Sequence, residues 1–78
     1  MNKLLKRRFH KHPMYLILWE FYVSEHTIRQ TVSRSLKMRL KNITDVYLKK
    51  LCHQNSFYDV YGHKVQYEPT DISIQKLD

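Results

Sequence analysis

Two pairs of side chains in this sequence are of types that could do chemistry, and neither has the partners that the chemistry requires. Cys52 and His53 are a nucleophile and a base in adjacent positions. Adjacent residues of a helix point about 100° apart, and no third group that could orient the base is recognisable. His10 and His12 could hold a metal, but no Cys or carboxylate lies near them in the sequence. We therefore expect a core cysteine, and neither a catalytic dyad nor a metal site.

Other signatures of enzymes are also missing from the sequence. Its single glycine excludes a glycine-rich phosphate loop, and its acidic residues are too scattered to nominate a catalytic pair. We expect a protein that is not an enzyme and has no cofactor.

The remaining chemical feature of the sequence is its excess of positively charged side chains. The formal net charge is +7, and residues 1–41 hold ten Lys and Arg against two Glu, whereas residues 42–78 hold four Lys against five acids. One strongly basic half is typical of a protein that binds a polyanion such as nucleic acid. The alternative is that these charges only keep the protein soluble. The candidate phosphate-binding residues are Lys6, Arg7, Arg8, Lys11, Arg34, Lys37, Lys41, Lys49, Lys50 and Lys64.

The length and composition favour one small intracellular domain. A chain of 78 residues buries only about 60–65% of the surface that its unfolded form exposes. The single cysteine cannot close an internal disulfide, which favours a reducing compartment, the cytoplasm or a eukaryotic nucleus. The absence of Ala and the single Gly, both with GC-rich codons, favour an AT-rich genome such as that of a phage, a virus or a mobile element.

The densest apolar run, residues 14–23, must supply much of the core. It is too short to span a bilayer, which needs about 20 apolar residues, and we expect no contact with a membrane. Pro13 suits a first helical position and the length suits three turns, so we favour a helix with Trp19 in the core. A strand is the alternative, because Tyr, Ile, Trp, Phe and Val favour strands.

The next segment has the pattern of an amphipathic helix over residues 27–40. Thr27 and Gln30 have the spacing of a capping box. Apolar residues then recur at intervals of four, and three cations gather on the opposite side of such a helix. The apolar stripe is Ile28, Val32, Leu36 and Leu40, and the cations are Arg34, Lys37 and Lys41.

A third helix and a hairpin complete the reading. The third helix covers residues 43–54, with Asn42 as its cap, and we expect it to bury Ile43, Tyr47, Leu48, Leu51 and Cys52. The only glycine stands at the first position of the two-residue loop Gly62-His63, which predicts a type II′ hairpin. That loop pairs Val60 with Val65. It places Tyr58, Val60, Val65 and Tyr67 on one face.

The order of these elements, an α+β fold of three helices followed by a C-terminal β-hairpin, resembles the winged-helix domain. The resemblance covers residues 14–69 and implies that residues 43–54 form a recognition helix entering the major groove. Residues 27–40 would then cross the duplex backbone, and Lys64 would stand at the tip of the wing. The recognition helix would begin with Thr44 and Asp45, and a carboxylate there repels phosphates, which argues against sequence-specific reading.

We expect three parts: a basic N-terminal arm at residues 1–12, a winged-helix-like domain at 13–69, and a tail or edge strand at 70–78. The expected function is a small nucleic-acid-binding protein, a regulator that contacts phosphates mainly without sequence specificity. The alternative is a protein-interaction module whose aromatic surface, with Phe57 and Tyr61 on the outer face of the hairpin, binds and modulates a partner. A homodimer is compatible with either.

Overall fold

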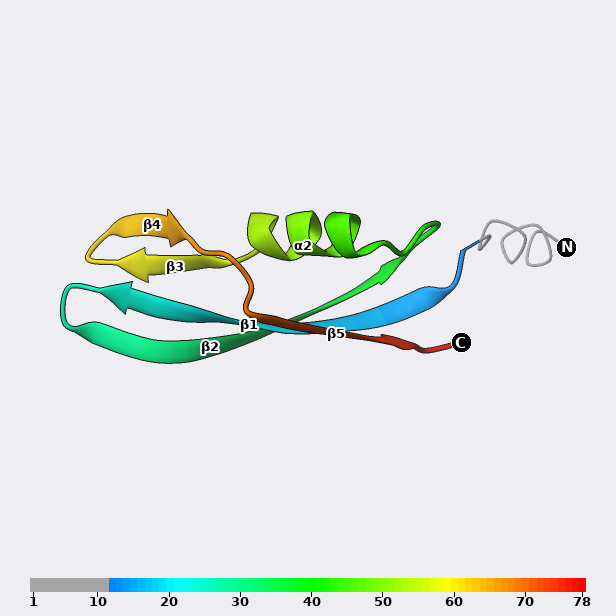
Figure 1. Cartoon of the computed structure of the whole chain (residues 1–78), viewed down its shortest axis with the longest axis horizontal. Coiled ribbons are helices and arrows are strands. Elements are labelled where there is room, and N and C mark those ends of the chain that lie inside the picture. Colours follow the sequence, from blue (N-terminus) through cyan, green and yellow to red (C-terminus); the bar gives the residue numbers. More distant parts are fainter. Residues whose placement is uncertain (1–11) are drawn as a thin grey trace, which may run out of the picture.

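The computed structural model describes residues 12–78, which contain five β-strands and one α-helix (Figure 1). The elements are β1 (Met14–Glu25), β2 (Ile28–Arg39), α2 (Asp45–Gln54), β3 (Phe57–Val60), β4 (His63–Gln66) and β5 (Asp71–Lys76). The expected fold of three helices followed by a hairpin is therefore wrong, and with it the winged-helix resemblance. The single helix of the described residues stands between the second and third strands.

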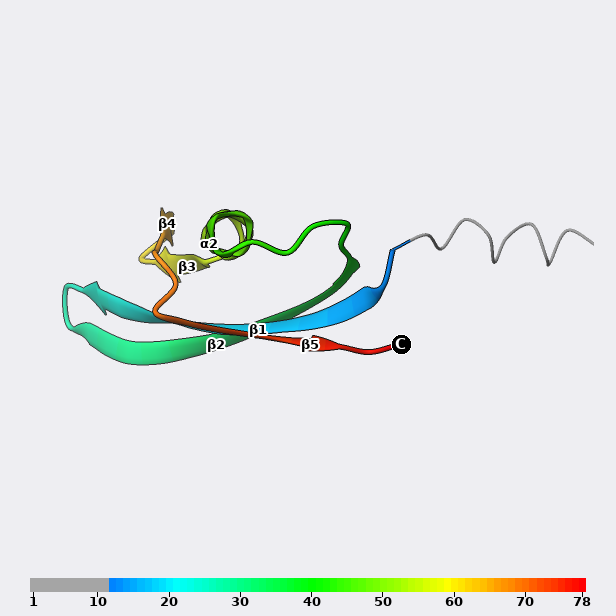
Figure 2. The same cartoon turned by 45° about the vertical axis from the view of Figure 1, so that its right-hand side comes forward.

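The molecule has two layers. One is an antiparallel sheet with the strand order β2-β1-β5, and the other consists of α2 and the β3–β4 hairpin. Figures 1 and 2 show α2 and this hairpin together over one face of the sheet. No element of residues 12–78 lies over the opposite face, which we call the uncovered face.

The apolar run at residues 14–23 forms a strand, so the preference for a helix was wrong. Odd-numbered residues of β1 are buried against the second layer, whereas Leu18 and Tyr22 on the other face are 45% and 48% exposed. Apolar side chains on both faces hide the alternation that normally identifies a strand. The β-propensity of the run is the signal that the structure follows.

The helix expected at residues 27–40 is also a strand, and its apolar stripe survives the change. Residues four apart lie on one face of a helix, but they also lie on one face of a strand, because four is a multiple of two. Ile28, Val32 and Leu36 accordingly pack against the core cluster from β2. Thr27, read as a cap, lies in the two-residue turn between β1 and β2.

The third helix is confirmed with a different cap. Thr44 is the N-cap residue, not Asn42, and its side-chain oxygen accepts a hydrogen bond from the backbone N–H of Tyr47 at 3.1 Å. Leu48 and Cys52 are buried as expected. Ile43 and Tyr47 were expected to be buried as well, but each is 41% exposed.

The hairpin is confirmed, but its turn lies one residue earlier than expected. The loop is Tyr61-Gly62, with φ angles of 49° and 85°, and positive φ at both positions defines a type I′ turn, not type II′. Val60 therefore pairs with His63 in place of Val65. Moving the turn by one residue moves the pairing by two, which keeps the same residues on each face.

One buried polar contact ties the two layers together. Trp19 is 4% exposed, as expected for a core residue, and its indole Nε1–H donates to Ser56 Oγ at 2.8 Å. Ser56 is itself fully buried, and its hydroxyl donates to the Cys52 carbonyl at 2.6 Å. The contact joins the middle of β1 to the end of α2.

The segment after Pro69, expected as a tail or an edge strand, is an edge strand. β5 pairs with β1 from Asp71 to Lys76.

Replacing Gly62 tests the turn. A Cβ at this position would meet no atom within 4 Å, so the cost of Gly62→Ala comes from the positive φ alone. We expect a loss of about 1–2 kcal/mol of unfolding free energy. Gly62→Asn should cost less, because Asn tolerates the left-handed region. Urea unfolding measures both, and equal losses for Ala and Asn would contradict the turn assignment.

Removing the acceptor of the Trp19 indole should destabilise the protein. Ser56→Ala leaves a buried N–H without its partner, which costs about 1–3 kcal/mol. In a Trp19→Phe background the same substitution should cost less, since the donor is already gone. Denaturant unfolding of the two single variants and the double variant gives the coupling energy. Additive losses would show that the hydrogen bond does not stabilise the fold.

Candidate nucleic-acid interface

β2 turns one row of polar side chains to the uncovered face. Its even-numbered apolar residues pack against the core, so the odd-numbered ones point to the other side of the sheet. This outward β2 row is Arg29, Thr31, Ser33, Ser35, Lys37 and Arg39. Every member carries a cation or a hydroxyl, and no acid occurs in the sequence between Glu25 and Asp45.

The backbone of the same residues faces the free edge of the sheet. Leu40 N–H donates to the Pro13 carbonyl at 3.2 Å. Hydrogen-bonded pairs recur at every second residue of an antiparallel ladder, so the even-numbered residues of β2 bond to β1. The N–H groups of the outward β2 row therefore point away from β1, to the side where no described strand lies.

Exposed apolar side chains of β1 border this row. Tyr22 lies beside Thr31 and Leu18 beside Ser35 in the register of the two strands. Tyr22 is nearly half-exposed and Arg29 is its diagonal neighbour on β2, an arrangement on which an unpaired base can stack. Glu20 lies on the same face beside Ser33.

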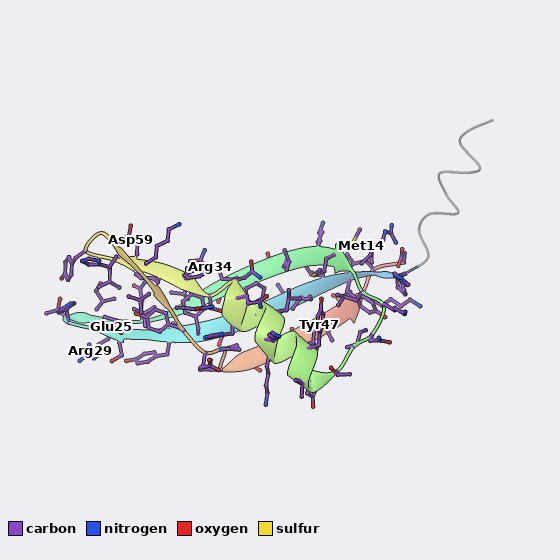
Figure 3. The ribbon with its side chains drawn as sticks, turned by 90° about the horizontal axis from the view of Figure 1, so that it is seen from above. Met14, Glu25, Arg29, Arg34, Tyr47 and Asp59 are labelled. Carbon is purple, nitrogen blue, oxygen red and sulfur yellow. The ribbon has the colours of Figure 1, made fainter. Side chains whose placement is uncertain are left out.

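The three cations assigned to one helix face are separated by the strand. Arg34 lies on the covered face, where its Nη2 donates to the Phe57 carbonyl at 2.8 Å and its guanidinium lies 5.6 Å from the centre of the Phe21 ring (Figure 3). It holds the hairpin against the sheet. Lys37 belongs to the outward β2 row, and Lys41 is exposed beyond the end of β2.

Two arginines of the outward row have their own anchors. Arg39 donates to the His12 carbonyl at 2.8 Å and forms an ion pair with Asp78 at 3.2 Å. Arg29 folds back onto the turn and donates to the carbonyls of His26 and Ile28, at 2.9 and 3.0 Å. These contacts hold both guanidinium groups close to the sheet.

The remaining candidate cations lie elsewhere. Lys49 and Lys50 are exposed on α2, and Lys64 is exposed on β4, all in the second layer. Lys6, Arg7, Arg8 and Lys11 lie outside the described residues, as does His10. The structure therefore does not gather all the candidates on one surface.

The candidates for a protein interface are Phe57, on the outer face of β3, and Tyr61, in the turn of the hairpin, and both are exposed. Their exposed fractions are 42% and 68%. The Tyr61 ring meets His26 edge-on at 5.3 Å between ring centres, and its hydroxyl lies 3.4 Å from Thr27 Oγ1. The tips of the two hairpins are thus in contact.

The groups considered for catalysis have structural roles. Cys52 is fully buried, as expected for a core cysteine, and desolvation raises the pKa of its thiol, which disfavours the nucleophilic thiolate. His53 Nε2 contacts a Glu68 carboxylate oxygen at 2.9 Å. Among residues 12–78 no three His, Cys, Asp or Glu side chains gather as metal ligands. Within the same range no helix is long and apolar enough to cross a membrane.

Arg29 is the functional candidate that sequence reasoning missed. On a helix it only flanks the apolar stripe, whereas on a strand it shares a face with Lys37, because both numbers are odd. Testing residues 28–39 for alternation as well as for helical periodicity would have found it. Comparisons of the chain with protein-family models, curated proteins and solved structures gave no match.

The carboxylate of Asp78 should make stability depend on pH. A hydrogen bond from the Met14 N–H, with a further contribution from Arg39, holds its pKa below the ordinary 3.8. A pKa lowered by folding stabilises the protein above the unfolded-state value, and this stabilisation is lost as the pH falls through the folded-state value. Asp78→Asn should therefore lower the Tm at neutral pH. The difference from the wild type should shrink below pH 3.8, and a constant difference would exclude ionisation as its cause.

Proposed function

We propose that this chain is a small nucleic-acid-binding protein that contacts phosphates along β2, mainly without sequence specificity. The observation that carries the proposal is the outward β2 row, in which cations and hydroxyls lie on one exposed edge strand and the backbone N–H groups of the members from Arg29 to Lys37 point away from β1. These are the groups that contact phosphate oxygens in protein–nucleic acid complexes. No carboxylate interrupts them within the strand.

The absence of sequence-specific reading follows from the same geometry. Side chains that reach base edges usually come from a helix or ribbon inserted into the major groove. α2, the helix of the described residues, packs on the sheet with Leu48 and Cys52 and begins with Asp45. Its carboxylate would meet phosphates on approach.

The length of β2 suits an extended ligand. Twelve residues at about 3.3 Å each span about 40 Å. A single strand of nucleic acid lying along β2 would meet Arg29 and Lys37 in turn, with Tyr22 beside Thr31 near the Arg29 end. Strong dependence on salt and tolerance of sequence are the expected properties of such binding.

A second candidate function is a protein-interaction module. The observation that favours it is the exposure of two aromatic residues of the hairpin, Tyr61 at 68% and Phe57 at 42%. An interface built on these rings would respond little to salt.

Neutralising the outward β2 row should flatten the salt dependence of nucleic-acid binding. Each phosphate-contacting cation contributes about 0.7–0.9 to the slope of log affinity against log salt concentration. The double variant Arg29→Gln, Lys37→Gln should therefore lower this slope by about 1.4–1.8. Fluorescence anisotropy of labelled mixed-sequence oligonucleotides, single-stranded and duplex, measures the slope.

The matched control is Lys49→Gln, Lys50→Gln, which removes the same charge from exposed positions on α2. This control should leave the slope nearly unchanged, and thermal melts should show that both variants remain folded. An equal effect of the two double variants would argue against a site on β2. A folded wild type without salt-dependent binding would remove the nucleic-acid proposal and leave the protein-interaction module.

A further inference from the structure

The two free edges of the sheet differ in charge. The β2 edge carries only cations among its charged residues, whereas β5 carries one acid and one base, Asp71 and Lys76, at its two ends. Natural proteins protect edge strands from pairing with other strands by placing charges on them, lysine above all. β2 has this protection and β5 has little of it.

The backbone of β5 offers unpaired groups at its free edge. Leu77 N–H donates to the Met14 carbonyl at 2.8 Å. By the alternation of an antiparallel ladder, Ser73 and Gln75 also bond to β1. The N–H and C=O groups of Ile72 and Ile74 therefore face outward, and no strand of residues 12–78 lies beside them.

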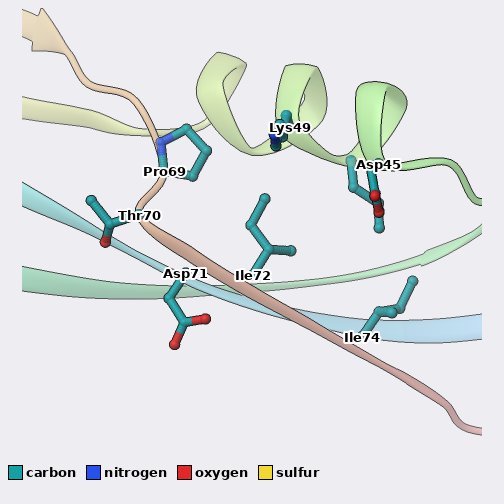
Figure 4. Close-up of a pocket in the computed structure, with 8 residues that line it drawn as sticks. Asp45, Lys49, Pro69, Thr70, Asp71, Ile72 and Ile74 are labelled. Atoms are coloured by element: carbon teal, nitrogen blue, oxygen red, sulfur yellow. The ribbon is translucent and has the colours of Figure 1, made fainter.

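An apolar groove opens beside this edge. Figure 4 shows Ile72 and Ile74 on β5 facing α2. The groove has a volume of about 380 Å³, and Leu48 and Pro69 complete its apolar lining. Its charged lining consists of two acids, Asp45 and Asp71, and one base, Lys49. The core of the protein is thus open on the β5 side.

We infer that a second copy of this chain covers the β5 edge, with the two β5 strands antiparallel about a two-fold axis. The pattern of β5 is apolar toward α2 and polar toward the uncovered face. Pairing with Ser73 on the axis places Ile72 of each copy opposite Ile74 of the other. In this register the side chains keep their faces and the outward backbone groups meet one another.

The charges agree with this choice of edge. In this register Asp71 lies opposite Gln75 of the other copy and Lys76 lies opposite Thr70, so no like charges meet across the two β5 strands. Pairing of two β2 edges would bring arginines and lysines together. The product is a six-stranded sheet, β2-β1-β5-β5-β1-β2, with an outward β2 row at each outer edge. This inference holds whether or not the chain binds nucleic acid.

A matched pair of serine substitutions tests the dimer. Ser73 on β5 and Ser35 on β2 are both exposed, and both lie opposite Leu18 of β1, at opposite edges of the same sheet. Ser73→Lys places like charges directly across the axis, whereas Ser35→Lys adds the same charge far from it. Sedimentation velocity over a range of concentrations should show wild-type particles of twice the 9.6 kDa chain mass. Ser73→Lys should raise the dissociation constant about fivefold or more, and Ser35→Lys should leave it nearly unchanged.

A cysteine at the same position tests the register. Residues directly opposite in a non-hydrogen-bonded pair have Cα atoms about 4.5 Å apart, within the range that a disulfide spans. Oxidised Ser73→Cys should run as a covalent dimer, and oxidised Ser35→Cys should not; thermal melts confirm that the variants are folded. A wild type that stays monomeric at all concentrations would overturn the inference, even if an extended peptide of another protein bound to β5. A dimer that Ser35→Lys disrupts and Ser73→Lys does not would overturn it as well.

Discussion

The buried indole N–H of Trp19 requires a hydrogen-bond acceptor inside the protein. The position of that acceptor, Ser56 Oγ, fixes where the second layer lies on the sheet. A buried donor without a partner costs about 1–3 kcal/mol, a large share of the stability of a domain this small. The acceptor, Ser56 Oγ, lies between the end of α2 and the start of β3, and its own hydroxyl bonds to the last turn of α2. The helix and the hairpin both leave from this point, so the contact places both over β1.

Because the helix and the hairpin leave from the same point, only one face of the sheet is covered. α2 and the β3–β4 hairpin cover the face that holds Ile17, Trp19, Phe21 and Val23, and the chain between residues 12 and 78 has no further element for the other face. β1, the central strand, therefore exposes Leu18 and Tyr22 on that side. The polar side chains that accompany them come from Glu20 and Ser24 of β1 and from the flanking strands. Both proposals arise from this incomplete covering: one concerns the cationic edge of the sheet and the other its opposite edge.

The sequence predicts an element correctly where its pattern of apolar residues fits only one type of secondary structure. Residues 43–54 read as a helix because Leu48 and Cys52 are four apart while Lys49, Lys50 and His53 fall on the other side, and the structure has this helix at residues 45–54. The faces of the hairpin follow from strict alternation. The location of Trp19 in the core follows from the apolar density around it. These features depend on local pattern, and each is present in the structure.

The long hairpin of β1 and β2 could not be predicted in the same way. Intervals of four residues from Ile28 to Leu40 satisfy a helix and a strand equally, and β1 is apolar on both faces, so neither segment shows a decisive period. Strand pairing decides between helix and strand, because each of the twelve residues of β1 pairs with one of the twelve residues of β2 across a two-residue turn. The site depended on that choice. A helix would place Arg34 and Lys37 on one face. In the strand, Arg34 instead contacts Phe57 on the covered face, and Lys37 shares the uncovered face with Arg29.

The cations of β2 then serve a structural need as well as the proposed binding. A free edge strand of twelve residues is a template on which other chains can pair, and charge along it opposes such pairing. In the proposed function the same charge attracts polyanions, whose phosphates would accept from N–H groups that point to the free edge. At the β5 edge the charges nearly cancel and Ile72 and Ile74 face an open groove. In the proposed dimer, one sheet would thus combine an edge that repels its own copy with an edge that pairs with it.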